Sequence, residues 1–186
     1  GIYNNDPYNI GTGNNPYGVM QENYSDSYSY NLNANAMLLF RIVKGLTLSV
    51  QGGYDFDYAP SYSFSSSKVA PGAKSSISNS AALHNYWQNT NNLTYSGTFG
   101  RHTLAATAVW ELSGVTDSSM SISGTGLSNE SVGYWDVSSA ATRSQSNGYS
   151  EPSLMSGIVR LNCDYDKRDF ITGGFRADGS SKFQKD

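Results

Sequence analysis

Few side chains in this sequence could carry acid–base or metal chemistry, and they are scattered. Asp55 and Asp57 are two residues apart, so in a strand both carboxylates project to one face, a spacing that acid–base pairs can use. We favour the interpretation that they hydrogen-bond to neighbouring strands. His84 and His102 lie far apart and outside any metal-ligand pattern. The single cysteine, Cys163, occupies an apolar position and is expected to pack as a small hydrophobe.

Motifs for catalysis or nucleotide binding are absent from the sequence. There is no Gly-rich phosphate loop, no Gly-x-Ser-x-Gly and no His-Glu-x-x-His. The formal net charge of -3 provides no basic footprint for nucleic acid. We therefore predict that the chain is not an enzyme, holds no cofactor or metal, and has no nucleic-acid partner.

One aromatic pair could bind a ligand by stacking. Tyr134 and Trp135 lie in a Ser- and Gly-rich stretch, with Asn129, Glu130 and Asp136 nearby as polar partners. A ring in such a loop can stack on a sugar or peptide face, or it can anchor the loop to its neighbours. The candidate ligand-contact residues are Tyr134, Trp135, Asn129 and Asp136.

The elements that must position these residues are strands. In the segment 46–58, Leu48, Val50 and Tyr54 fall on one parity, whereas Gln51 and Asp55 fall on the other. Successive side chains of a strand point to opposite faces, so the segment has one apolar face and one polar face. The same alternation predicts six strands, at about 28–42, 46–58, 83–95, 102–112, 153–165 and 170–178.

The predicted connections alternate between short and long. The ranges 43–45, 96–101 and 166–169 are tight turns with Gly, or with Asp and Lys, whereas 59–82 and 113–152 are long and rich in Ser, Gly and Asn. In an antiparallel meander every second connection lies at the same end of the sheet. We therefore expect all three short turns at one end, an asymmetry that is typical of transmembrane barrels.

Charged side chains avoid the apolar parity in every predicted strand. A charge facing lipid at the bilayer midplane costs about 2 to 4 kcal/mol for Arg or Lys, although a dry sandwich core would impose the same rule. Two places fit less well. Asn89 and Asn91 share the apolar parity, which predicts a bulge or a position outside the membrane, and Met37 and Leu39 share the polar one. The charges on the polar parity are Arg41, Asp55, Asp57, Glu111, Arg160, Asp164, Arg176 and Asp178.

Composition permits a membrane barrel and excludes a helical membrane protein. The longest apolar run, at 36–40, is far short of the roughly 18 residues that a membrane helix needs. Barrel strands need only about 9 to 11 residues, of which every second one is apolar. The N-terminus has no basic region followed by an apolar run, so we expect a mature form or an internal piece of a longer protein.

The C-terminal hairpin contains two short motifs, Arg160-Leu161-Asn162 and the octapeptide Arg176-Ala177-Asp178-Gly179-Ser180-Ser181-Lys182-Phe183. With these motifs the hairpin resembles a characteristic hairpin of the SusC/RagA family of TonB-linked outer-membrane transporters. Cys163 and Asp169 stand where aromatic residues are more usual in that family. Weaker agreement covers nearly the whole chain, in the motifs Asn15-Pro16-Tyr17, Lys44-Gly45-Leu46, Asn92-Leu93-Thr94-Tyr95 and Phe99-Gly100-Arg101-His102.

The resemblance implies an all-β fold. The chain would be an antiparallel meander, a six-stranded segment of one large transmembrane β-barrel domain over residues 1–186, without plug or accessory domains. Its short turns would be periplasmic, and 59–82 and 113–152 would be extracellular loops. Arg160, Asn162, Arg176 and Asp178 would face the lumen.

The resemblance also implies a function and partners. The chain would be the wall and outer loops of a TonB-dependent importer of oligosaccharides or oligopeptides in the bacterial outer membrane. A SusD-like surface lipoprotein, the TonB complex acting through the missing plug, and the lipid bilayer would be its partners. The alternative is a secreted or surface β-sandwich, a binding module or adhesin that recognises glycans.

Overall fold

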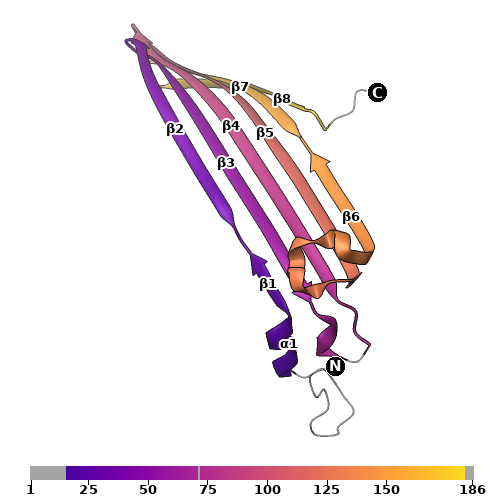
Figure 1. The fold of residues 1–186 in the computed structure, drawn as a ribbon. Coiled ribbons are helices and arrows are strands. Elements are labelled where there is room, and N and C mark those ends of the chain that lie inside the picture. Colours follow the sequence, from indigo (N-terminus) through magenta and orange to yellow (C-terminus); the bar gives the residue numbers. More distant parts are fainter. Residues whose placement is uncertain (1–15, 71, 183–186) are drawn as a thin grey trace. The chain divides into compact units, whose positions relative to one another are not determined.

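The computed structural model describes residues 16–70 and 72–182, and its elements are almost all strands. Asn15 and Phe183, which belong to the quoted motifs, lie outside the described residues. Figure 1 traces the elements in chain order. They are α1 (Pro16–Glu22), β1 (Tyr24–Ser27), β2 (Tyr30–Val43), β3 (Leu46–Ser65), η1 (Ser67–Val69), β4 (Ser76–Phe99), β5 (His102–Leu127), η2 (Glu130–Trp135), η3 (Val137–Ser139), β6 (Ala140–Ser150), β7 (Ser153–Tyr165) and β8 (Asp169–Ser180).

The strands pair as a meander with six positions, as predicted. The order is β1-β3-β4-β5-β7-β8, while β2 also pairs with β3 and β6 also pairs with β5. Two of the six positions therefore hold a strand that is interrupted once, between β1 and β2 and between β6 and β7. Backbone bonds bridge both interruptions, from Tyr28 N to Pro60 O at 2.9 Å and from Val115 N to Pro152 O at 2.9 Å. The second interruption falls at Pro152, which has no N–H to donate to a ladder.

The three short turns lie at one end of the sheet, which confirms the prediction from their spacing. Gly45 O accepts from Ser96 N at 2.8 Å, and Arg101 O accepts from Asp166 N at 2.8 Å, so each turn touches the next hairpin. Figure 1 shows the turns of β2–β3, β4–β5 and β7–β8 gathered together. In the last turn Asp166 and Lys167 both have positive φ, of 52° and 57°, and Arg168 N donates to Tyr165 O at 3.0 Å. These are the features of a primed turn, here within the three-residue connection 166–168.

The strands are longer than the sequence predicted, so the long connections 59–82 and 113–152 are wrong in extent. β3 continues to Ser65, β4 begins at Ser76, β5 continues to Leu127 and β6 occupies 140–150. These extensions are rich in Ser, Gly and Thr. A β-ladder is made by backbone groups and tolerates such side chains, whereas the prediction followed apolar alternation alone. The connections that remain are 66–75, in which residue 71 is not described, and 128–139.

The chain divides into two compact units. Unit 1 comprises residues 1–30, 57–83 and 117–149, and unit 2 comprises 31–56, 84–116 and 150–186. Unit 1 has a small core in which Ile77 is only 1% exposed and packs with Phe64 and Tyr134. In unit 2 the large apolar residues of β8 are open, with Ile171 and Phe175 74% and 71% exposed.

A single sheet accounts for all the strands that the described ranges contain. A β-sandwich buries its apolar face against a second sheet, so the sandwich alternative does not fit this architecture. The open apolar face of unit 2 is instead what a barrel wall presents to lipid.

Candidate functional site

The register of β7 and β8 separates apolar from polar side chains. Val159 pairs with Phe175, and Cys163 pairs with Ile171, so these side chains share one face. Cys163 is a free thiol of intermediate exposure on this apolar face, as its position predicted.

The opposite face of the same two strands carries the four residues predicted to point into a lumen. Asn162 pairs with Thr172, and its Oδ1 accepts from Thr172 Oγ1 at 3.0 Å. Arg176 Nε donates to Asp178 Oδ2 at 2.8 Å. Arg160 falls on the same parity as Asn162 and pairs with Gly174. The register thus brings Arg160, Asn162, Arg176 and Asp178 to one face, while their position in a lumen stays a prediction.

The apolar and polar faces continue into β5. Val159 pairs with Ala108 and Leu161 with Ala106 on the apolar face, whereas Arg160 pairs with Thr107 on the polar face. Glu111 pairs with Ser156 and so lies on the polar face with Arg160.

A chain of hydrogen bonds crosses the polar face from β4 to β5. Tyr86 Oη donates to Gln88 Oε1 at 2.6 Å, and Gln88 Nε2 donates to Thr90 Oγ1 at 2.9 Å. Gln88 Nε2 and Thr90 Oγ1 both donate to Glu111 Oε2, at 3.3 Å and 3.0 Å. The chain therefore runs in one direction and ends on a carboxylate.

A second chain links β2 to β3. Asn35 Nδ2 donates to Asn33 Oδ1 at 2.7 Å, and Asn33 Nδ2 donates to Asp55 Oδ1. The interpretation that Asp55 hydrogen-bonds to a neighbouring strand is confirmed. Gly53 keeps space beside this chain, because a Cβ there would lie 2.9 Å from Asn35 Oδ1.

The two chains line one polar hollow in unit 2. Its volume is ≈ 120 Å³, and it is lined by Asn33, Asn35, Gln51, Gly53, Asp55, Tyr86 and Gln88. Through this hollow the polar sides of β2, β3 and β4 meet. By alternation Leu48, Val50 and Tyr54 then lie on the face opposite Gln51 and Asp55, as predicted. The hollow offers amides, a phenol and one carboxylate, which suits hydrogen bonding to polar solutes.

Two asparagines of the apolar parity form a short chain of hydrogen bonds. Asn91 Nδ2 donates to Asn89 Oδ1 at 2.5 Å, and Asn89 Nδ2 donates to the Gln51 carbonyl at 3.3 Å. Asn91 is buried. A buried amide is costly only when its polar atoms lack partners, so this pairing explains how the apolar parity accommodates them.

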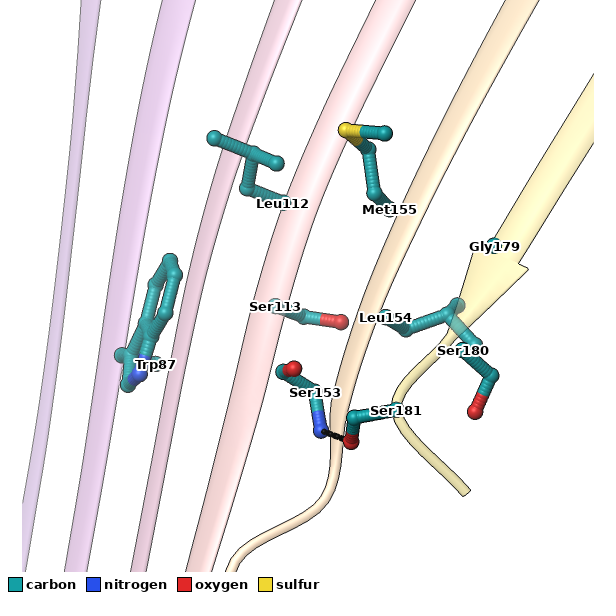
Figure 2. A pocket seen from close by; sticks show the side chains of 9 residues that line it. All are labelled: Trp87, Leu112, Ser113, Ser153, Leu154, Met155, Gly179, Ser180 and Ser181. Carbon is teal, nitrogen blue, oxygen red and sulfur yellow. Dashed lines mark hydrogen bonds between the residues drawn. The ribbon is translucent and has the colours of Figure 1, made fainter. Parts of the chain in front are cut away.

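A larger hollow beside β5, β7 and β8 is shown in Figure 2. Its volume is ≈ 380 Å³, and its bulky apolar lining comes from Trp87, Leu112, Leu154 and Met155. The remaining lining residues are serines and Gly179, and Ser153 N donates to Ser181 Oγ at 2.8 Å. No charged side chain lines it, so it offers shape without acid–base or ionic chemistry.

Unit 1 contains the aromatic pair that the sequence singled out, and its two rings have different environments. Tyr134 is 7% exposed and belongs to the small core, whereas Trp135 is 77% exposed. The ring centroid of Tyr134 lies 5.3 Å from that of Tyr24 and 5.5 Å from that of Tyr62. The ring centroid of Trp135 lies 4.9 Å from that of Tyr134 and 5.8 Å from that of Tyr62. Tyr134 is therefore packed into the core of unit 1, whereas the Trp135 ring is exposed, and ligand contact by either residue stays a prediction.

The predicted polar partners of this pair cap the 3-10 turns. Asn129 Oδ1 accepts from Ser131 N at 3.0 Å, and Asp136 Oδ1 accepts from Ser138 N at 2.9 Å. Such Asn and Asp side chains fix local turns by bonding to the backbone two residues on. Both are thereby engaged within η2 and η3.

Glu130 links the connections 66–75 and 128–139, which we call the tip connections. The sequence did not reveal this role. Its carboxylate accepts from Ser66 Oγ at 2.6 Å and from Ser67 N at 3.2 Å, and also from Ser67 Oγ. Burial tends to raise the pKa of Glu130, but the hydrogen bonds from Ser66, Ser67 and Ser75 outweigh it, and the pKa lies below its usual value of 4.5.

The Tyr134 hydroxyl donates to the Asp26 carboxylate of β1. That hydrogen bond, assisted by burial, raises the pKa of Tyr134 to about 12. Asn79 Nδ2 also donates to the Tyr134 carbonyl at 2.8 Å. No local signal predicts these contacts, because their partners lie 55 to 108 residues apart in the chain.

The described part of the chain contains no helix that is long and apolar enough to cross a membrane. Within the same ranges, no group of three or more His, Cys, Asp or Glu side chains is arranged to hold a metal ion. The His102 ring lies 4.8 Å from that of Tyr165, beside the short turns.

Known proteins of similar sequence and fold are transporters and receptors. TonB-dependent receptor P3 of Formosa agariphila is 25% identical over 197 residues, which covers 100% of this chain and 19% of the receptor. The structure of the RagAB peptide transporter has a TM-score of 0.76 and 22% identity, covering 89% of this chain and 19% of that one. The predicted SusC/RagA resemblance is confirmed. No family model matches the chain.

The six-position sheet has the fold of a stretch of RagA-type barrel wall. The RagAB peptide importer in its closed-closed state gives the same TM-score of 0.76 at 22% identity, over 88% of this chain and 19% of that chain. The chain thus spans about a fifth of the length of the SusC/RagA-like proteins that it matches. A segment of this length has no need to close into a barrel by itself.

Proposed function

We propose that this chain is part of the wall and outer loops of a TonB-dependent importer in a bacterial outer membrane. The observation that carries the proposal is the sheet of unit 2, in which one face is apolar and open while the other carries the hydrogen-bonded amides and carboxylates. Lipid outside and a wet lumen inside are the two environments that such a sheet satisfies.

The transported solute in this proposal is an oligosaccharide or an oligopeptide. The polar hollow lined by Asn33, Asp55 and Gln88 supports passage of such hydrogen-bonding solutes, because its side chains offer both donors and acceptors. A SusD-like surface lipoprotein would cap the extracellular side. Energy would come from the TonB complex through a plug, and plug and lipoprotein are separate from the residues described above.

The proposed orientation places the short turns on the periplasmic side. The tip connections 66–75 and 128–139 would then be extracellular, together with the strand extensions that unit 1 contributes. The strand segments of unit 2 would cross the bilayer, with Arg160, Asn162, Arg176 and Asp178 facing the lumen.

Cysteine labelling tests which face meets water. The full-length parent protein, carrying Cys163→Ala, would receive Leu161→Cys or Asn162→Cys, two adjacent positions on opposite faces. In outer-membrane vesicles we expect a small membrane-impermeant thiol reagent to label the Asn162→Cys variant at least about tenfold faster, because lipid shields position 161. Equal labelling, or faster labelling at 161, would refute the proposed wall.

A further inference from the structure

Ser66 is a buried polar residue at the start of the tip connection 66–75. Only 1% of its surface is exposed. Serine is mostly an exposed residue type, and a buried hydroxyl or N–H is costly unless it is hydrogen-bonded. The bonds that Ser66 makes therefore indicate which parts of unit 1 this position holds together.

The hydrogen bonds of Ser66 join three segments that are distant in sequence. Its N–H donates to Oδ1 of Asn23, the residue that follows α1, at 2.9 Å. Its hydroxyl donates to Oε2 of Glu130, the first residue of η2, at 2.6 Å. The hydroxyl oxygen also accepts from Lys68 N at 3.2 Å and so caps η1. Ser66 thus bonds α1, η1 and η2 to one another.

The α1 side of this junction has two further bonds. Asn23 N donates to Val19 O at 3.0 Å, which ties Asn23 to the helix that precedes it. Lys68 Nζ of η1 forms an ion pair with Glu22 Oε2 of α1 at 3.2 Å. An exposed ion pair stabilises little by itself, so the buried bond between Asn23 and Ser66 is the stronger link between α1 and η1.

Ser75 secures the other end of the same tip connection. It is 2% exposed. Its carbonyl accepts from Gly126 N at 2.8 Å, and its Oγ accepts from Leu127 N at 2.8 Å. Both ends of this tip connection are therefore hydrogen-bonded to the segment 126–130.

The small core of unit 1 takes residues from the same segments. Phe64 precedes the first tip connection, Ile77 follows it, and Tyr134 belongs to the second one. The ring centroid of Tyr24, which follows Asn23, lies 5.2 Å from that of Phe64 and 5.3 Å from that of Tyr134. Opening any one segment would expose apolar surface of the others, so their opening is linked in free energy.

We propose that α1 and the two tip connections form one cooperative unit that opens and closes as a whole, with Ser66 as its central residue. Partial opening is costly, because each segment would leave a buried polar or apolar group of another without its partner. A molecule that displaced one of these segments would have to displace all three. The proposal goes beyond the importer function and does not depend on it, since the contacts that carry it lie within unit 1.

Native-state hydrogen exchange of the full-length parent in detergent tests this cooperativity. Mass spectrometry would follow exchange in peptides that cover 16–23, 66–75 and 128–139. The substitution Ser66→Ala removes the hydroxyl and its bonds but keeps the backbone N–H. We expect exchange to become about tenfold faster in all three segments, by the same factor in each, because they open together.

Two further variants make the test specific. Asn23→Ala removes the acceptor of the Ser66 N–H from the α1 side, and exchange should again rise in all three segments, by about fivefold. Ser63→Ala is the matched control. Its hydroxyl donates to the Ser78 carbonyl at 3.1 Å, outside the three segments, so exchange in them should stay unchanged.

Three results would overturn the proposal. They are faster exchange only in the segment that carries the substitution, clearly different factors in the three segments, or no change in Ser66→Ala. Ser67→Ala covers the case in which Ser66→Ala does not fold. It removes one hydroxyl bond to Glu130 and keeps the bond from Ser67 N, so a smaller but equally uniform rise is expected. The labelling of positions 161 and 162 reports on the barrel wall alone, so the two proposals can fail separately.

Discussion

The two units of this chain share several long strands but differ in how their apolar side chains are accommodated. Unit 1 buries Phe64, Ile77 and Tyr134 together and ties its tips with side-chain bonds. Unit 2 has no comparable core among the described residues, and its apolar side chains remain open. A sheet can be stabilised by packing within the protein or by the environment that its apolar face contacts. Under the proposed barrel-wall function, unit 2 depends on the second.

The largest difference in stability between the two units is expected from the substitution Ile77→Ala. Ile77 is 1% exposed in the core of unit 1, so removing its side chain costs about 2 to 5 kcal/mol in lost burial and cavity formation. Hydrogen exchange of the full-length parent should rise in 59–82 and 128–139 and stay unchanged in the turns of unit 2. Uniform loosening of both units would show that they are not independent.

Val159→Arg tests the outside support of unit 2. If Val159 faces lipid at mid-depth, the substitution should lower the free energy of unfolding by about 2 to 4 kcal/mol. Urea unfolding in lipid vesicles measures this cost, with Asn162→Arg on the polar face as the control. Similar unfolding of both variants would contradict a lipid-facing Val159.

Glu130 should make unit 1 sensitive to acid. The pKa of Glu130 in the folded protein lies below 4.5, its usual value. The stability that the ionised carboxylate contributes is therefore complete above about pH 4.5 and is lost as the pH falls through the folded-state pKa. Glu130→Gln should weaken the tip by about 1 kcal/mol at neutral pH and remove this acid step. Limited proteolysis across pH 3 to 7 is the measurement, and an acid step that persists in the variant would assign it to another group.

Tyr134 should add a smaller step at alkaline pH. In the folded protein its pKa is about 12, above the usual 10. Its contribution to the free energy of unfolding is therefore complete below pH 10. This contribution declines as the pH rises from 10 towards 12, because the phenol ionises first in the unfolded chain. Fluorescence-detected unfolding of unit 1 should lose this step in Tyr134→Phe. Retention of the step would mean that the bond to Asp26 does not govern it.

Local patterns were enough to predict six strand positions, the three short turns and the two faces. Alternation along Leu48, Val50 and Tyr54 and the turn at 166–169 depend only on neighbouring residues, so the sequence displays them directly. The strand ends were missed because serine-rich segments pair through the backbone, which side-chain polarity does not report.

Contacts distant in sequence were the part of the candidate site that could not be predicted. Glu130 meets Ser66 across 64 positions, and Tyr134 meets Asp26 across 108. Nothing in the types of these residues specifies the partner. The sequence did leave open whether Tyr134 anchors or binds, and its burial decides for anchoring. Trp135, Asn129 and Asp136 were named together, but Asn129 and Asp136 cap the 3-10 turns, and Trp135 is a large exposed ring.

The three short turns also set the order in which this sheet can assemble. Each joins strands that meet only two or three residues apart in sequence, so closing them costs little chain entropy and takes microseconds. The ladders β2–β3, β4–β5 and β7–β8 can therefore zip from the turn end before the hairpins join one another. The pairing of β1 with β3, in which Tyr24 meets Phe64, continues the β2–β3 ladder at the end farthest from its turn. We expect it to form late, so that the tips of the molecule are the last part to become rigid.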